Sequence, residues 1–188
     1  MTTPVTAGRP GYAEAMAQFS LENAKSLLSS DLETGLNACV ECCDRHVASG
    51  RTALTWIAAD GRIETYSFAD LQAMAARAAN VFSEAGVQPG DVVSGLLTRT
   101  PELMATVLGA WRVGAAYQPL FTAFGPKAIE QRLTTSRARL VVTDSANRAK
   151  LDSVPNAPQV ALVRAHDADL PSGDIDLRAA MAAAKPDF

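Results

Sequence analysis

The sequence is poor in cysteine, and its three cysteines all lie within Cys39–Cys43. Cysteines this close together cannot form a framework of disulfide bonds, so we expect a reducing, cytoplasmic compartment. Histidine is also scarce, with two in the chain. Cys39, Cys42, Cys43 and His46 could in principle hold zinc, but one helix cannot surround a tetrahedral ion. We therefore predict that these cysteines pack in the core, with no metal site.

Long hydrophobic runs are absent: none approaches the ~20 residues that a membrane-spanning helix needs. The first ten residues lack the basic start and apolar core of a signal peptide. They are rich in proline, glycine and threonine, so we predict a flexible arm over residues 1–11. The net charge is −3, from 17 basic and 20 acidic residues, and gives no reason to expect a nucleic acid partner.

Several motifs of nucleotide and acyl-transfer enzymes are also missing. The sequence contains no Gly-x-x-x-x-Gly-Lys-Ser/Thr loop, no Gly-x-Gly-x-x-Gly turn and no Gly-x-Ser-x-Gly elbow. These absences leave the chain without a recognisable phosphate-binding loop of its own. Its length of 188 residues and its 48% hydrophobic content suit one globular domain, which we place at residues 12–188.

Residues 89–143 alternate between strand and helix patterns. Helices of this length between strands imply right-handed crossovers and a parallel sheet. Thr100-Pro101 and Gly125-Pro126 begin the two helices, with Thr100 as the expected cap. The sequence therefore predicts an α/β fold with a doubly wound, mostly parallel sheet and flanking helices. The predicted strands are residues 92–97, 115–120 and 139–143, with a fourth at 159–163, and the predicted buried stripe of the first helix is Leu103, Val107, Leu108 and Trp111.

Helices and a β-hairpin are predicted before this region. One helix carries Ala15 and Phe19, and another runs from Leu36 to Val47. Asp60-Gly61 between two β-prone runs indicates the hairpin, at residues 53–57 and 62–66. Ser67, three residues before Asp70, suggests a capping box for a helix that buries Leu71, Met74, Ala75, Ala78 and Phe82. After the third strand we expect a short helix at 145–151, a loop at 164–175 and a last helix at 176–184.

The loop at residues 120–126 is the most unusual stretch, because Phe121 and Phe124 flank small residues. It follows the carboxyl end of a parallel strand, where open α/β sheets bind ligands, and its rings could stack on a planar group. Alternatively, the two rings plug the core. Arg148 and Lys150 follow the next strand and could meet a phosphate, or could simply be solvated helix charges.

Three blocks of sequence resemble AMP-forming acyl-CoA synthetases, the adenylate-forming enzymes. They are residues 65–71 (TYSFADL), 86–93 (GVQPGDVV) and 108–120 (LGAWRVGAAYQPL). The acetyl-CoA synthetase-like branch is indicated by Leu36-Asn37 with Asp44-Arg45-His46, and by residues 121–133 (FTAFGPKAIEQRL). In such enzymes this last loop packs on the adenine of CoA, and arginines after the following strand meet the CoA 3′-phosphate.

By position, this resemblance implies that Phe121 and Ala123 face the CoA adenine and that Arg148 meets the phosphate. The chain departs from the family in having Thr122-Ala123 where two glycines are common. It also has Lys150-Leu151 near where a second arginine is often found.

The resemblance covers residues 12–188, about the first third of such an enzyme, and so implies an incomplete N-terminal portion of the adenylate-forming ligase fold. In the complete enzyme a carboxylate attacks ATP, with Mg, to give acyl-AMP and pyrophosphate, and CoA then displaces AMP. The ATP phosphate loop, the acyl pocket and the C-terminal domain would follow Phe188, so we expect the chain alone to be inactive. Two alternatives are a free-standing module that binds CoA or a nucleotide, and a partner subunit that self-associates through exposed apolar surface.

Overall fold

The structure is a computed structural model that describes residues 11–33 and 35–188, and almost all of the predicted arm lies outside them. The described residues up to Leu36 form one compact unit, and Asn37–Phe188 form a second. The single domain expected over residues 12–188 stays a prediction. Among the residues that the structure describes, no helix is long and apolar enough to cross a bilayer.

The second unit is built around a five-stranded sheet in the order β4-β3-β5-β6-β7, in which all neighbouring strands are parallel. In its register, Ser94 of β3 aligns with Gln118 of β4 on one side and Val141 of β5 on the other. The predicted parallel α/β sheet is confirmed, and the four predicted strands are present. The fifth, β7, was missed because two residues are too short a run to show a pattern. The strands are β3 (Val92–Leu96), β4 (Ala116–Pro119), β5 (Leu140–Asp144), β6 (Gln159–Val163) and β7 (Ile175–Asp176).

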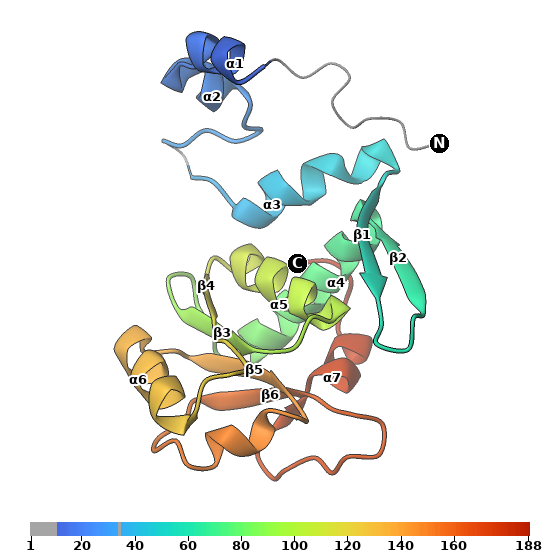
Figure 1. Ribbon diagram of the computed structural model, residues 1–188, viewed down its shortest axis with the longest axis vertical. Helices are drawn as coiled ribbons and strands as arrows, with labels where there is room; N and C mark the ends of the chain where they lie inside the picture. The colour runs from blue at the N-terminus through green and yellow to red at the C-terminus, as the bar shows by residue number, and fades with distance from the viewer. Residues whose placement is uncertain (1–10, 34) are drawn as a thin grey trace. The chain divides into compact units, whose positions relative to one another are not determined.

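Helices cover both faces of this sheet, as the doubly wound prediction requires (Figure 1). Leu140 and Val142 of β5 pack into one hydrophobic cluster, and Val141 between them packs into another. Successive side chains of a strand point to opposite faces, so this alternation shows that both faces are buried. The first cluster involves α4 (Phe68–Glu84), α5 (Pro101–Arg112) and α7 (Leu177–Ala183), and the second involves α6 (Pro126–Ser136) and the 3-10 helix η2 (Arg148–Leu151).

The buried stripe predicted for α5 is only partly right. Leu108 is buried, but Leu103, Val107 and Trp111 are only partly buried. Most of the buried α5 positions are small, and a Cβ placed on Gly109 would lie 2.7 Å from Ala78 Cβ of α4. Two helices this close leave room only for small side chains, which a pattern of large apolar residues does not indicate. Thr100 precedes α5, but its side chain makes no capping hydrogen bond.

The second predicted N-terminal helix is broken. Asn37 caps α3 (Ala38–Cys42), because its side-chain oxygen accepts a hydrogen bond from the N–H of Cys39 at 2.9 Å. The chain leaves helical geometry at Cys43 (φ −128°, ψ −65°) and continues as the 3-10 helix η1 (Asp44–Ser49). A continuous helix to Val47 was therefore wrong. Core packing is confirmed for Cys39 and Cys43, which are 0% and 1% exposed, whereas Cys42 is exposed.

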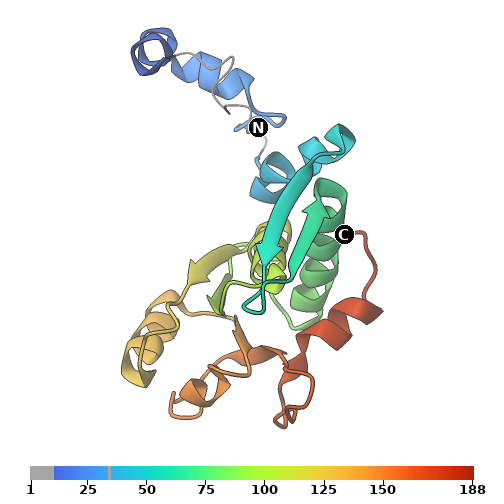
Figure 2. The same cartoon turned by 45° about the vertical axis from the view of Figure 1, so that its right-hand side comes forward.

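The predicted hairpin and capping box are confirmed. Strands β1 (Thr52–Ile57) and β2 (Ile63–Ser67) pair antiparallel and lie alongside α4 (Figure 2). Gly61 in the turn takes φ +85°, a left-handed conformation that glycine adopts without a steric cost. At the start of α4, Ser67 Oγ accepts from the N–H of Asp70 at 3.2 Å, and Asp70 Oδ2 accepts from the N–H of Ser67 at 2.8 Å. Both orphan donors are thereby satisfied.

Hydrogen bonds from α4 hold the last residues of the chain, which lie beside this helix in Figure 2. The Arg77 guanidinium donates to the carbonyl oxygen of Met181 at 3.1 Å, at the carboxyl end of α7, where helix carbonyls lack partners within the helix. The Asn80 amide donates to the carbonyls of Lys185 at 3.1 Å and Asp187 at 2.8 Å.

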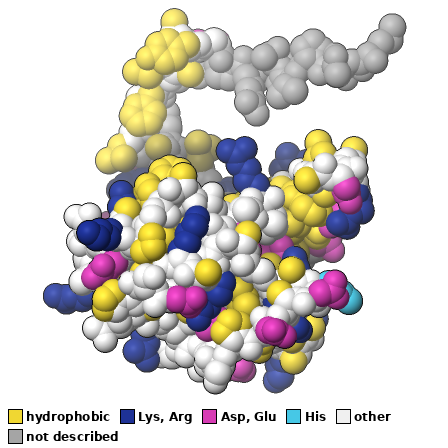
Figure 3. Space-filling view, turned by 60° about the horizontal axis from the view of Figure 1, so that its bottom comes forward, with side chains coloured by type: hydrophobic (Ala, Val, Ile, Leu, Met, Phe, Trp, Pro, Cys, Tyr) yellow, Lys and Arg dark blue, Asp and Glu magenta, His cyan; other side chains and the backbone are white. Residues whose placement is uncertain are grey.

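The first unit contains two short helices, α1 (Tyr12–Gln18) and α2 (Leu21–Ser26), and neither buries a residue. Ser20 caps α2 by accepting from the N–H of Asn23 at 3.0 Å. Large apolar side chains are exposed on this unit, and they gather on α1 and α2 in Figure 3. Phe19, expected inside the first helix, lies just beyond it and is 67% exposed.

Candidate functional site at the carboxyl edge of the sheet

A network of polar groups links the carboxyl ends of β3 and β5. Asp144, the last residue of β5, accepts hydrogen bonds from the N–H and the hydroxyl of Thr98, both at 2.9 Å. Its other oxygen accepts from the N–H of Asn147 at 3.0 Å and from the Asn147 side-chain amide at 2.8 Å. Asp144 and Asn147 are buried, so their oxygens and N–H groups are satisfied within the protein. The network holds the two strand ends in a fixed relation.

Lys150 extends this network to the loop that follows β4. Its Nζ donates to the side-chain oxygen of Asn147 at 2.8 Å and to the carbonyl oxygen of Thr122. Thr122 lies between Phe121 and Ala123, two of the predicted site residues. A cation therefore lies directly against the predicted ligand loop, and it is Lys150 rather than Arg148.

The loop presents one aromatic ring to solvent and one to the core. Phe121 is 71% exposed, and its ring meets that of Phe124 edge to face, with centroids 5.3 Å apart. Phe124 packs against the core, and the centroid of its ring lies 4.1 Å from the guanidinium carbon of Arg132. Ala123 is exposed beside Phe121. The interpretation that both rings plug the core therefore holds for Phe124 but is wrong for Phe121. Stacking of Phe121 on a planar ligand stays a prediction.

Arg148, the third predicted site residue, is held by two carboxylates. Its Nε and Nη2 donate to the two oxygens of Asp174, the latter at 3.1 Å, and its Nη1 donates to Asp152 at 2.6 Å. The hydrogen bond that Arg148 donates to Asp174 is the main cause that raises the pKa of Arg148 above its ordinary value. The structure therefore brings Phe121 and Ala123 together in one exposed loop, and directs Arg148 toward Asp174.

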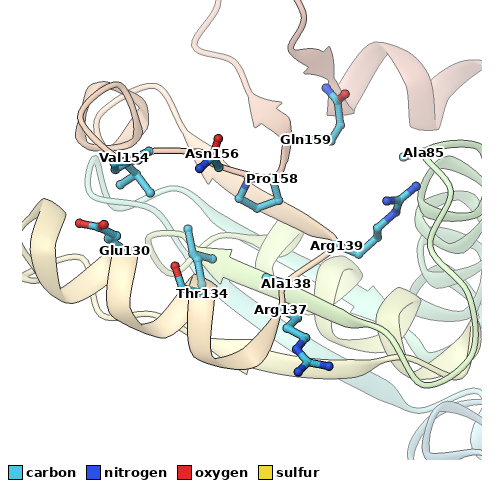
Figure 4. Close-up of a pocket in the computed structure, with 12 residues that line it drawn as sticks. Ala85, Glu130, Thr134, Arg137, Ala138, Arg139, Val154, Asn156, Pro158 and Gln159 are labelled. Atoms are coloured by element: carbon cyan, nitrogen blue, oxygen red, sulfur yellow. The ribbon is translucent and has the colours of Figure 1, made fainter.

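A hollow of about 740 Å³ lies at the opposite edge, near the amino ends of β5 and β6 (Figure 4). None of the three predicted site residues lines it. Figure 4 shows Arg137 and Arg139 pointing to opposite sides, so their charges do not converge on one ligand position. The carboxyl edge remains the better candidate, since ligands of open parallel sheets bind there.

Thr98, Asp144 and Asn147 were not predicted. All three follow the ends of predicted parallel strands, a position that would have drawn attention to them. The cysteine group shows no such convergence, and within the described parts of the chain no cluster of three or more His, Cys, Asp or Glu side chains could hold a metal ion.

The model of the family "AMP-binding enzyme" matches residues 43–186. The chain belongs to this family. Among curated proteins, it is 38% identical to the acetyl-coenzyme A synthetase of Bacillus subtilis over 158 residues, which are 81% of this chain and 27% of that enzyme. It is 32% identical to the acetyl-coenzyme A synthetase of Escherichia coli K12 over 123 residues, 64% of this chain and 19% of the relative.

Solved structures give the same result. The acyl-CoA synthetase of Brucella canis is 55% identical with a TM-score of 0.91, over 96% of this chain and 33% of that one. Apo MatB from Rhodopseudomonas palustris is 27% identical with a TM-score of 0.66, over 81% of this chain and 29% of that one. The expected adenylate-forming fold is confirmed, and the chain corresponds to an N-terminal portion of an acyl-CoA synthetase, at a third or less of the relatives' length.

Proposed function

We propose that this chain works within an acyl-CoA synthetase, which joins a carboxylate to CoA with ATP, in the presence of Mg, as the energy source. The observation that carries this proposal is the match to the Brucella canis acyl-CoA synthetase, with 55% identity and a TM-score of 0.91 over 96% of the chain. The substrates are then small molecules, and the three free thiols suit a reducing cytoplasm.

Within that enzyme we assign CoA binding to the loop after β4 and to η2. The open face of the Phe121 ring fits the adenine, and exposed Ala123 lets the ligand lie close to the backbone. Arg148 would hold the phosphate, and Lys150 adds positive charge beside Thr122. CoA supplies the thiol that accepts the acyl group. The residues of this chain would bind and orient it.

We propose further that the chain does not catalyse the reaction by itself. Charge placed at the phosphates dominates catalysis of phosphoryl chemistry, and these 188 residues contain no recognisable loop for that task. The assay is carboxylate-dependent exchange of pyrophosphate into ATP by the purified chain. We expect no exchange, and turnover above a protein-free control would disprove inactivity.

A chimera tests the proposed function directly. Replacing the matching third of the Brucella canis enzyme with this chain should give a protein that catalyses pyrophosphate exchange and forms acyl-CoA, because the two portions share one fold. The unmodified Brucella enzyme serves as the reference. A chimera that is monodisperse and folded, yet inactive in both half-reactions, would contradict the assignment.

A second candidate function is a free-standing CoA-binding module, which the exposure of Phe121 favours. Stacking of a base on an aromatic side chain contributes about 1–3 kcal/mol, so Phe121→Ala should weaken CoA binding by roughly 5- to 150-fold. Leu170→Ala, which removes another exposed apolar side chain, is the matched control. Calorimetry that shows no CoA binding by the wild-type chain would exclude this candidate.

A third candidate is a partner subunit. Tyr12, Leu21 and Leu27 are 83%, 68% and 72% exposed, and contiguous apolar surface marks interaction sites. Light scattering over a range of concentrations should then show self-association, which a strict monomer would contradict.

A further inference from the structure

The ion pair between Arg148 and Asp174 is less exposed to solvent than the neighbouring pair between Arg148 and Asp152. Both oxygens of Asp174 accept from one guanidinium, a bidentate arrangement that is among the stronger side-chain contacts. The Asp174 side chain is only 5% exposed and that of Arg148 18%, so water competes weakly for this pair. Asp152, the other partner, has a side chain that is 66% exposed, and its contact is correspondingly weaker.

The local balance of charge opposes an anion at Arg148. One guanidinium faces two carboxylates, so the group carries a net negative charge. Lys150 does not correct this balance, because its ammonium is directed to Thr122 and Asn147. A phosphate that approaches Arg148 therefore meets repulsion from Asp174 and finds both of the arginine's paired donors occupied.

The segment that presents Asp174 is a tight turn at the edge of the sheet. The N–H of Asp174 donates to the carbonyl of Pro171 at 3.1 Å. Gly173 within the turn has φ +90°, and no atom beyond its two chain neighbours lies within 4 Å of the position that a Cβ would take. Asp174 immediately precedes the two-residue strand β7. Its carboxylate is thus supplied by a short peripheral turn, whereas Arg148 follows the central strand β5.

We propose that Asp174 competes internally for Arg148, so that a phosphomonoester binds there only after this ion pair opens. The inference rests on the proposed CoA site and adds a control to it: the affinity for CoA depends on a carboxylate that contacts no part of the ligand. The phosphate replaces Asp174 as the bidentate partner of the guanidinium.

Calorimetry with CoA and with 3′-dephospho-CoA tests this competition. Asp174→Asn should bind CoA about tenfold more tightly than the wild type, with no change for 3′-dephospho-CoA, because only the phosphate contacts Arg148. Asp167→Asn removes the same charge from a side chain that is 96% exposed and should change neither affinity. Equal gains for both ligands, or CoA that binds the wild type and Asp174→Asn with the same affinity, would overturn the proposal.

A second measurement separates the ion pair from the CoA site. The Nε–H resonance of Arg148 should respond to inorganic phosphate at lower concentrations in Asp174→Asn than in the wild type. If every variant fails to bind CoA while this difference persists, the proposed CoA function is wrong and the competition stands. An identical phosphate response would refute the competition.

The wild-type chain gives a further test that does not depend on the variant's folding. Saturating phosphate or CoA should shift both the Arg148 Nε–H and the Asp174 carboxyl carbon resonances. Resonances that stay unmoved at saturation would also overturn the proposal.

Discussion

Replacement of Gly109 by alanine should separate the two longest helices of the second unit. The new Cβ would lie 2.7 Å from Ala78 Cβ, 3.2 Å from the amide nitrogen of Ala79 and 3.3 Å from the carbonyl oxygen of Ala75. Two of these atoms belong to the α4 backbone and the third is an alanine Cβ. None can move by rotation of a side chain, so the helices must move apart. Overpacking of this kind costs about 1–3 kcal/mol. Alanine instead of glycine within a helix offsets about 1 kcal/mol of that.

The net expectation is a loss of up to about 2 kcal/mol in the free energy of unfolding, and a melting temperature lower by up to roughly 8 °C. Urea unfolding followed by circular dichroism measures it. The double variant Gly109→Ala, Ala78→Gly removes the methyl group that is struck, and should lose less stability than the sum of the two single variants. If Gly109→Ala were more stable than the wild type by about 1 kcal/mol, the change would reflect only the higher helix propensity of alanine. That result would refute the close approach of α4 and α5.

The remaining predictions concern the α4 cap, the thiols and the hydrogen bonds from Arg77 to the end of α7. Ser67→Ala should cost about 1 kcal/mol in urea unfolding through loss of the α4 cap. Hydrogen bonds from Ser67 lower the pKa of Asp70, so this stabilisation is present at neutral pH and is lost as the pH falls through the Asp70 pKa; an unchanged acid dependence in Asp70→Asn would contradict it. Only Cys42 should react with a maleimide in the native chain, since Cys39 and Cys43 are buried, and rapid labelling of all three would exclude this packing. Burial raises the pKa of Cys43 from 9.0 to about 12, so unfolding free energy should fall as the pH rises through that window, and less so in Cys43→Ala. Arg77→Met should speed hydrogen exchange at the carboxyl end of α7 by removing charged hydrogen bonds worth about 1.5–3 kcal/mol; unchanged exchange there would show that these bonds do not hold the helix.

Most of the fold could be predicted because its elements carry local patterns. The strand at residues 159–163 and the helix beginning at Pro126 were placed correctly by apolar runs and start signals within a few residues. The break at Cys43 could not be foreseen, because the apolar spacing continues through it. There Asp44 pairs with the Arg112 guanidinium of α5, a contact across 68 positions of sequence. Tertiary contacts of this kind override local pattern.

The candidate site was predicted only in part for a similar reason. Phe121 and Ala123 share a short loop, so their proximity follows from the chain itself. The partner of Arg148 lies 26 residues away, beyond a strand and a long loop. The position of Arg148 after a strand could not predict which group would bind its guanidinium, because Asp174 lies at the amino-terminal start of β7.

The hydrogen bonds between α4 and the last residues have a consequence for biosynthesis. The side chains of Arg77 and Asn80 donate to carbonyl groups that lie 104 to 107 positions later in the chain. A ribosome delivers about 5–20 residues each second, so α4 emerges several seconds before its final partners do. During that interval the side of α4 that later contacts α7 is uncovered and accessible to a chaperone.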